Sequence, residues 1–133
     1  MKLFLDDFRQ PTDCIRYMAA RLNGYSIIYA DSDWVIVKNY DEFIEAVKAA
    51  GDNLEIVSFD HDLADEHYDP DKYGSETYDE IYDSFEFKTG YDCAKWMIEH
   101  YQENNWKLPK ILVHSMNPAG TENIKSLFKN LQK

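Results

Sequence analysis

The sequence has few cysteines, few basic residues and no long apolar run. Cys14 and Cys93 are the only cysteines among 133 residues, which excludes both a disulfide framework and the clustered thiols of a zinc site. A reducing cytoplasm is therefore the location that we expect. The apolar run before the first acids has only three residues, Leu3, Phe4 and Leu5, and no run approaches the roughly 18 apolar residues of a membrane span. We expect neither secretion nor membrane insertion.

Acidic residues outnumber basic ones, with 25 Asp and Glu against 14 Lys and Arg and a formal net charge of −11. A field of this sign repels duplex nucleic acid and anionic membranes, so we expect neither as a partner. An anionic substrate would need a bound cation, a few placed basic groups or helix N-termini. Hydrophobic residues still make up 44% of the chain, which is enough for one globular domain over residues 1–133.

Strands and helices are predicted to alternate along the chain. Short apolar runs with polar ends predict strands over residues 2–5, 34–38, 54–59 and 110–115. Apolar residues at helical spacing predict helices over residues 13–22, 41–50, 89–101 and 117–131. Thr89 is placed to cap the third of these helices.

Residues 25–38 allow two interpretations. Two β-prone runs, 25–29 and 34–37, are separated by the segment Ala-Asp-Ser-Asp. They form either a hairpin or a loop followed by one strand. We favour the single strand over residues 34–38.

The alternating order predicts an α/β fold with a parallel sheet between two layers of helices, a three-layer sandwich of the flavodoxin or receiver type. We expect about four strands in the order 2-1-3-4, which makes strands one and three neighbours about 4.8 Å apart. Ligands of such sheets bind at the carboxyl ends of the strands. Those ends carry the segments Asp-Asp, Asp-His-Asp and His-Ser.

Asp6, Asp7 and Asp60 would therefore converge at one edge of the sheet. Three carboxylates without a cation would repel one another, whereas a divalent cation with oxygen ligands removes that cost. Mg²⁺ is the cation that this set favours, with Mn²⁺ as the alternative. A simpler reading is that Asp6 and Asp60 cap loops or adjacent helices.

His61 and His114 follow two different strands near the same edge. Because imidazole titrates near neutral pH, the pair suits general acid and base catalysis on a phosphoester. One would accept a proton from the attacking oxygen and the other would protonate the leaving group. The alternative is that each ring simply hydrogen-bonds the backbone.

Phosphate ligands are predicted in two places. In the segment HSMNPAG, Ser115, Asn117 and the amides of the following helix can donate to phosphate oxygens, while Gly120 permits close approach of the backbone. Asn117 would equally serve as an ordinary N-cap. Arg9 follows the first acids and either clamps phosphate or forms a salt bridge with a neighbouring acid.

Residues 64–88 form an acidic, Tyr-rich insertion after the third strand. Within it, Asp69, Asp71, Gly74 and Glu80 match positions one, three, six and twelve of a calcium loop. Tyr73 stands where Asp or Asn is expected, and no convincing helix precedes the loop. We therefore favour a solvated acidic lid over a calcium site.

Four segments, LFLDDFR, SFDHDLADEHY, TGYDCAKW and VHSMNPAG, follow one another over nearly the whole chain. Together they resemble the receiver-like domains named for cyclic-phosphate processing. The resemblance implies a receiver fold with a retained acidic pocket. It also implies hydrolysis of cyclic phosphate groups on nucleotides or RNA ends.

By this resemblance, Asp6 and Asp7 match the acidic pair of receivers. Asp60 matches the aspartate that accepts a phosphoryl group in signalling, and Ser115 matches the hydroxyl residue on the following strand. A fifth strand bearing the receiver lysine is not evident, which argues against signalling through Asp60. His61 and His114 are additions that suit hydrolysis.

The leading hypothesis is a metal-assisted phosphoesterase with Asp60, His61 and His114 as catalytic residues and a small phosphorylated ligand or an RNA terminus as substrate. A non-catalytic receiver-like module for signalling or phospho-ligand binding is the first alternative. A domain whose acidic insertion contacts a basic protein is the second. The sequence does not predict an oligomeric state.

Overall fold

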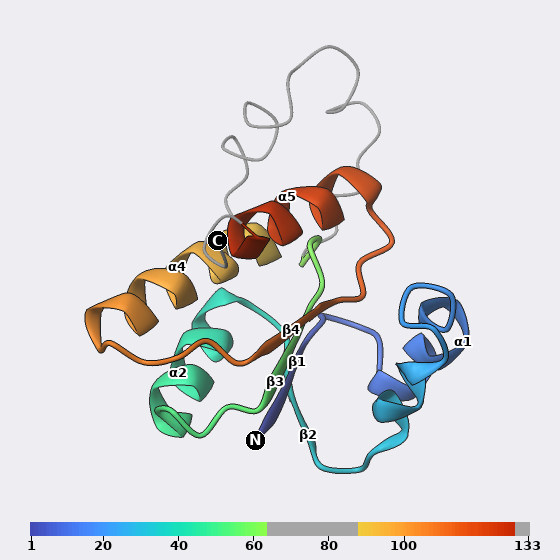
Figure 1. Ribbon diagram of the computed structural model, residues 1–133, viewed down its shortest axis with the longest axis horizontal. Helices are drawn as coiled ribbons and strands as arrows, with labels where there is room; N and C mark the ends of the chain where they lie inside the picture. The colour runs from blue at the N-terminus through green and yellow to red at the C-terminus, as the bar shows by residue number, and fades with distance from the viewer. Residues whose placement is uncertain (64–87, 130–133) are drawn as a thin grey trace.

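The fold is built on a parallel sheet of four strands. The computed structural model describes residues 1–63 and 88–129. Its strands run in the order β2-β1-β3-β4 (Figure 1), which confirms the predicted order. Their bounds are β1 Lys2–Leu5, β2 Trp34–Val37, β3 Ile56–Phe59 and β4 Lys110–Val113.

The register brings the carboxyl ends of the three adjacent strands level with one another. Leu5 of β1 pairs with Phe59 of β3, and Phe59 pairs with Val113 of β4. The next residue on each strand continues the ladder, because Asp60 N–H donates to Leu5 O at 2.9 Å and His114 N–H donates to Phe59 O at 3.0 Å. Polar residues that are far apart in sequence thus meet where the carboxyl ends of the strands lie side by side.

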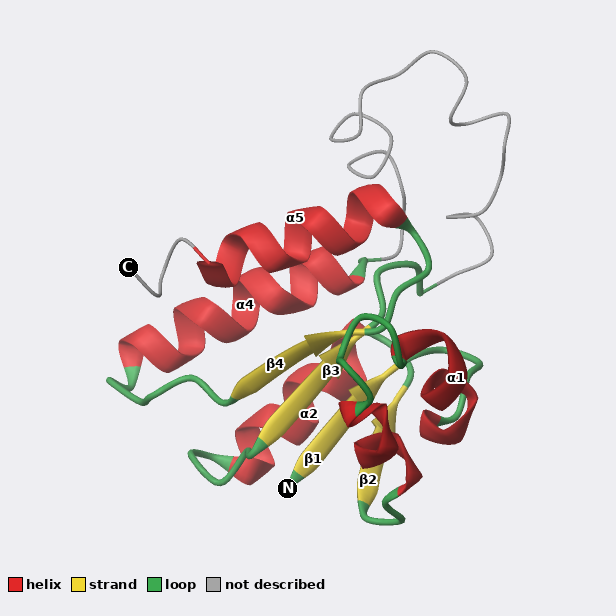
Figure 2. Ribbon diagram, turned by 45° about the vertical axis from the view of Figure 1, so that its right-hand side comes forward, coloured by secondary structure: helices red, strands yellow, loops and turns green. Residues whose placement is uncertain are grey.

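Helical layers cover both faces of the sheet (Figures 1 and 2). One face carries α2 (Tyr40–Ala50), α4 (Gly90–Glu103) and α5 (Pro118–Lys129). The other carries the 3₁₀-helix η1 (Pro11–Cys14), the single turn α1 (Ile15–Met18) and the 3₁₀-helix η2 (Tyr25–Ala30). This arrangement matches the predicted three-layer sandwich.

Alternate residues of the strands supply two separate cores. Leu3, Leu5, Val57 and Phe59 pack with α2, α4 and α5. Phe4, Ile56 and Leu112 pack on the opposite face with Met18 and Tyr29, among others. Because both faces are buried, the strands read as continuous apolar runs in the sequence.

The hairpin interpretation of residues 25–38 is wrong, because residues 25–30 form η2 and only residues 34–37 join the sheet. Ser26 and Tyr29 are the buried residues of η2, and their spacing of three matches the three residues per turn of a 3₁₀-helix. The Tyr29 ring stacks on Trp34 with centroids 5.6 Å apart. Packing by one aromatic side chain therefore overrides the β propensity of this run.

The helix predicted over residues 13–22 is shorter and less regular than expected, since it consists of η1 followed by α1. The predicted α4 is confirmed, including a capping box between Thr89 and Asp92. The calcium pattern and most of the acidic insertion fall within residues 64–87, outside the described residues. Among the helices of the described part, none has the length and apolar character of a membrane span.

Candidate functional site

Asp6, Asp60 and His114 meet at the carboxyl ends of β1, β3 and β4. One ligand atom from each lies within 4.8 Å of the others, and all three side chains are buried. Asp7, which the sequence also assigned to the cation, is half-buried and is not part of this group in the described ranges. The strand ends thus bring together Asp6, Asp60 and His114, and the imidazole takes the place beside the two carboxylates that was predicted for Asp7.

Asp6 is held by four hydrogen-bond contacts. Its Oδ1 accepts the backbone N–H groups of Phe8 at 3.0 Å and Arg9 at 2.9 Å. Its Oδ2 accepts from Arg9 Nη1 at 3.2 Å and lies 3.0 Å from His114 Nε2. Burial disfavours the charged form, but the hydrogen bonds from His114, Arg9 and Phe8 outweigh it and lower the pKa of Asp6. Asp6 is therefore an ionised carboxylate that also caps its own loop.

Asp60 has a different environment from Asp6. Its Oδ1 accepts the N–H of His61 at 2.9 Å, whereas its buried Oδ2 has no hydrogen-bond partner in the described part of the chain. Burial, followed by the negative charge of Asp6, raises the pKa of Asp60 to about 8. A buried carboxylate oxygen without a partner costs free energy unless a proton or a cation joins it. The pair of carboxylates therefore fits a divalent cation with oxygen ligands.

Arg9 supplies the positive charge of the site. Its Nη1 lies 3.2 Å from Asp6 Oδ2 and 3.7 Å from Asp60 Oδ1. The guanidinium also lies 4.7 Å from the centroid of the Phe8 ring. Of the two predicted roles for Arg9, the salt bridge to neighbouring acids is the one that the structure contains.

Both ring nitrogens of His114 are engaged by protein groups. Nε2 faces Asp6 Oδ2, and Nδ1 lies 2.7 Å from Ser58 Oγ. Ser58 Oγ lies in turn 2.7 Å from the hydroxyl of Tyr29. The imidazole stacks on Phe4, with centroids 4.3 Å apart and planes 9° apart. His114 thus begins a chain of polar groups that runs from the site into the core.

The direction of every hydrogen bond in this chain follows from the charge states. Burial lowers the pKa of His114, so its ring is neutral. An ionised Asp6 only accepts, so the proton of the ring lies on Nε2 and Nδ1 is an acceptor. Ser58 O–H therefore donates to Nδ1, and Tyr29 O–H donates to Ser58 Oγ. This order leaves His114 as a donor that holds Asp6.

His61 is fully buried, and its Nδ1 lies 2.9 Å from Asp62 Oδ1. Two glycines make room around it. A Cβ at Gly120 would overlap the His61 ring, and a Cβ at Gly90 would overlap the carbonyl group of Asp60. The starts of α4 and α5 therefore close onto residues 60–61, which explains why both helices begin with a glycine near their first turn.

Ser115 and Asn117 hold the turn between β4 and α5. Ser115 Oγ accepts the N–H of Asn117 at 3.1 Å, and Asn117 Oδ1 accepts the N–H of Gly120 at 3.0 Å. Asn117 thus is the N-cap that the sequence allowed as an alternative. Its Nδ2 also donates to Asp62 Oδ2 at 3.3 Å, which links this turn to the residues after β3.

Sequence reasoning missed Tyr29, Ser58 and Asp62. Ser58 is the one hydroxyl residue inside a buried apolar strand, and buried polar groups need partners. That rule was the available signal for Ser58. The signal for Asp62 was its position, because it directly follows His61 in the polar segment at the end of β3.

Comparison with known proteins supports one assignment. A family model described as the cyclic-phosphate processing receiver domain matches residues 1–130. No curated protein and no solved structure matches the chain. The match extends over the sheet, both helical layers and all the site residues described above. The chain belongs to the cyclic-phosphate processing receiver domain family.

Proposed function

We propose that this chain is a metal-assisted phosphoesterase that hydrolyses a cyclic phosphate on a nucleotide or an RNA end. The observation that carries the proposal is the buried Asp60 Oδ2, which lacks a hydrogen-bond partner in the described ranges and lies beside the ionised Asp6. Such an oxygen is suited to a cation, and cations are a common means of binding phosphate. The family assignment supplies the class of substrate.

Asp6 and Asp60 would hold the cation through oxygen atoms. Because His114 Nε2 carries the proton that Asp6 accepts, the site offers carboxylate oxygens first, and this favours Mg²⁺ with Mn²⁺ as the alternative. Asp7 stays a predicted ligand, since its carboxylate follows directly on Asp6. When bound, such a cation polarises the phosphate and stabilises the charge that develops during hydrolysis.

Arg9 would change partners when substrate binds. Its guanidinium now compensates the charges of Asp6 and Asp60 at 3.2 and 3.7 Å. With a divalent cation at these carboxylates, Arg9 is no longer needed there and its planar fork can bind two phosphate oxygens. Ser115 and Asn117 would orient the phosphate through the turn that they hold.

His61 is the better candidate for proton transfer. Asp62 accepts from its Nδ1, an arrangement that makes Nε2 the basic nitrogen of an imidazole. His61 would take a proton from the attacking water as that oxygen bonds to phosphorus and one ester P–O bond breaks. The released ribose oxygen takes a proton from solvent, His61 returns its proton to solvent, and the product is a phosphomonoester. His114, whose two nitrogens are both engaged, would act by positioning Asp6.

The experiment that tests the proposal uses the full chain and a panel of substrates. Cyclic mononucleotides and RNA oligonucleotides with 2′,3′-cyclic phosphate ends are incubated with the protein, with added Mg²⁺ or with a chelator, and the products are separated by chromatography. We expect a phosphomonoester product in Mg²⁺ and none in chelator. No turnover of any substrate would overturn the proposal. Turnover that survives chelation would remove the cation from it.

One observation favours a second function, a binding module for phosphorylated ligands. His61 and His114 are both fully buried, whereas a group that transfers protons to substrate must reach it. Calorimetry separates the two functions. Saturable, Mg²⁺-dependent binding of a cyclic nucleotide that is recovered unchanged would support the binding module. Under either function we propose a small phosphorylated ligand or an RNA terminus as partner and a cytoplasmic location.

A further inference from the structure

Strand β4 lies at an edge of the sheet (Figure 2) and has backbone groups available for a further strand. Lys110 N–H donates to Glu55 O, and His114 N–H donates to Phe59 O, each at 3.0 Å. Alternate residues of a parallel strand face the same neighbour, so Ile111 and Val113 face away from β3. The two N–H groups of these residues and the Ile111 carbonyl have no hydrogen-bond partner in the described part of the chain. Arg21 Nη1 donates to the Val113 carbonyl at 3.3 Å and to the Ser115 carbonyl at 2.9 Å.

A groove runs between this edge and α5. Its volume is about 310 Å³, close to the lower limit of ligand-binding pockets, and it is lined by Pro109, Lys110, Ile111, Val113, Lys125, Phe128 and Lys129. Val113 and Phe128 are buried and Ile111 is half-buried, so the floor of the groove is apolar. A groove of this size takes a few side chains and not the surface of a folded domain.

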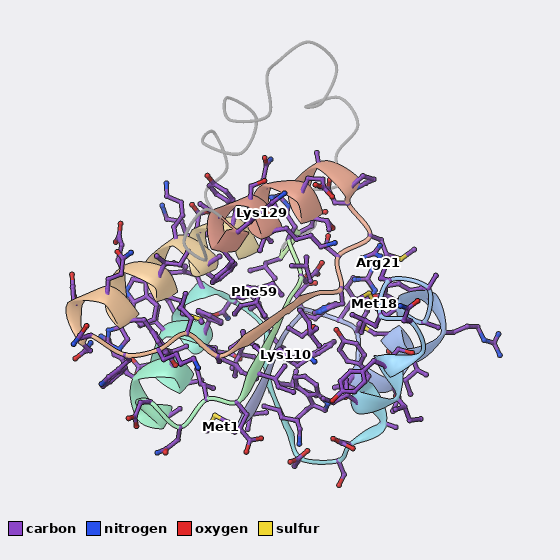
Figure 3. All side chains as sticks on the ribbon, in the orientation of Figure 1. Met1, Met18, Arg21, Phe59, Lys110 and Lys129 are labelled. Atoms are coloured by element: carbon purple, nitrogen blue, oxygen red, sulfur yellow. The ribbon has the colours of Figure 1, made fainter. Side chains whose placement is uncertain are left out.

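The rim of the groove is basic in a chain that is otherwise acidic. Lys110, Lys125 and Lys129 are exposed, and Figure 3 labels Lys110 on β4 and Lys129 on α5. The Lys110 ammonium lies 4.2 Å from the centroid of the Tyr25 ring on the η2 side of the sheet, so Lys125 and Lys129 supply the charge on the α5 side. None of the salt bridges found among the described residues involves these three lysines. Residues 104–129 hold four lysines and one glutamate, a net charge of +3, within a chain of net charge −11. The positive potential is thus local to this edge.

We propose that the groove between β4 and α5 binds an extended acidic segment of a partner protein. The segment would pair with Ile111 and Val113 as an added strand, since an open strand edge is a template for such pairing. Its apolar side chains would contact Ile111, Val113 and Phe128. Its carboxylates would lie near Lys125 and Lys129. This surface is separate from the carboxylate site, so the inference does not depend on the proposed hydrolysis.

Charge also decides against the most obvious other occupant, a second copy of the chain. Two copies joined edge to edge through β4 about a two-fold axis would bring the lysines of one copy against those of the other. Like charges at such an interface cost free energy. With a partner segment rich in Asp and Glu, the electrostatic contribution to the free energy of binding becomes favourable.

The probe is a soluble peptide of about seven residues whose alternate side chains face the groove. These are glutamates at the two outer positions and valines at the two inner ones, with threonine elsewhere. A matched peptide has lysine in place of both glutamates. Binding to ¹⁵N-labelled full chain is followed by NMR. We expect the glutamate peptide to shift the amide signals of Ile111 and Val113 and to slow their hydrogen exchange, and the lysine peptide to do neither. Equal binding of both peptides, or shifts confined to other elements, would overturn the proposal.

Charge reversal tests the role of the lysines. The double variant Lys125→Glu, Lys129→Glu should weaken binding of the glutamate peptide by about tenfold or more, while Lys48→Glu, at an exposed position of α2, should leave it unchanged. Lys48, Lys125 and Lys129 are all exposed, so both variants should fold. The proposal would be contradicted if the wild-type chain self-associates and the double variant self-associates more strongly. The occupant of the groove would then be a second copy of the chain. Displacement of the peptide by single-stranded RNA, with RNA binding more tightly, would also contradict it.

Discussion

The imidazole of His114 and the carboxylate of Asp6 form a buried pair, with Nε2 and Oδ2 3.0 Å apart and neither side chain exposed to solvent. The pair links the carboxylate site to the hydroxyl groups of Ser58 and Tyr29. It also fixes the orientation of Asp6, an ionised carboxylate beside Asp60. The geometry of the proposed cation site therefore depends on groups that lie behind it in the core.

The tautomer of His114 is the first prediction. Because burial lowers the pKa of His114 below its ordinary value of 6.5, the ring should remain neutral at pH 6.5, where an unperturbed imidazole is half protonated. The proton should lie on Nε2. Long-range ¹H–¹⁵N NMR spectra of the metal-free protein report both properties. A doubly protonated ring at that pH, or a proton on Nδ1, would show that the hydrogen-bond order assigned here is incorrect.

The stability of the metal-free protein should depend on Asp60 and pH. The pKa of Asp60 is raised from 3.8 to about 8, so the native state keeps a proton that the unfolded state releases, and this residue makes stability fall as pH rises between these values. Asp60→Asn removes the dependence. The variant should therefore gain stability over wild type between about pH 5 and pH 8, on the order of a few kcal/mol.

Urea unfolding in chelator at both pH values measures this difference. Excess Mg²⁺ provides the control, since a cation that stabilises the ionised Asp60 should reduce the advantage of Asp60→Asn at the higher pH. If the free energy of unfolding of Asp60→Asn exceeds that of the wild type by the same amount at about pH 5 and at about pH 8, then Asp60 does not carry a raised pKa in the native state.

Arg9 should compete with the cation. It lies 3.2 Å from Asp6 and 3.7 Å from Asp60, so Arg9→Ala removes a positive charge that a divalent cation would otherwise have to displace. We expect Arg9→Ala to bind Mg²⁺ about tenfold more tightly, equivalent to about 1.4 kcal/mol, while turnover of a cyclic phosphate falls. Calorimetry and the substrate panel measure the two effects. Arg16→Ala, at an exposed position of α1, should change neither, and weaker Mg²⁺ binding by Arg9→Ala would argue against competition.

Gly120 should be required for the packing of His61. An alanine in place of glycine normally stabilises a helix by up to about 1 kcal/mol. In α5 the added Cβ would overlap the His61 ring, so Gly120→Ala should instead destabilise the protein by about 1–3 kcal/mol. Thermal or urea unfolding decides the sign. Ser126→Ala, at an exposed position of the same helix, should have little effect, and a stabilising Gly120→Ala would place His61 elsewhere.

Local patterns in the sequence were sufficient to predict the sheet and its polar edge. Each strand is a short apolar run that ends in polar residues, and alternation with helices implies parallel order. With the further assumption of the strand order 2-1-3-4, Asp6 and Asp60 become neighbours. The boundaries of the strands were less accurate, because an apolar or polar residue next to a strand does not show where pairing stops.

The choice among hydrogen-bond partners could not be predicted. Arg9 had two plausible partners in sequence, phosphate or carboxylate, and only the position of Asp60 beside Asp6 favours the carboxylates. The burial of His61 depends on the close approach of Gly120, which lies 59 residues later in the chain. Tyr29 reaches Ser58 because η2 packs over the sheet, whereas the local propensity of residues 25–29 suggested a strand.

Titration of the metal-free chain with Mg²⁺ and Mn²⁺ by calorimetry at about pH 8 tests the central claim most directly. We predict one saturable site in the wild type that is lost in both Asp6→Asn and Asp60→Asn, because each removes a ligand charge. Asp33→Asn, whose carboxylate pairs with Lys2 on the surface at 2.7 Å, should bind like the wild type. Absence of binding to the wild type, or undiminished binding to Asp60→Asn, would contradict a cation site at these carboxylates.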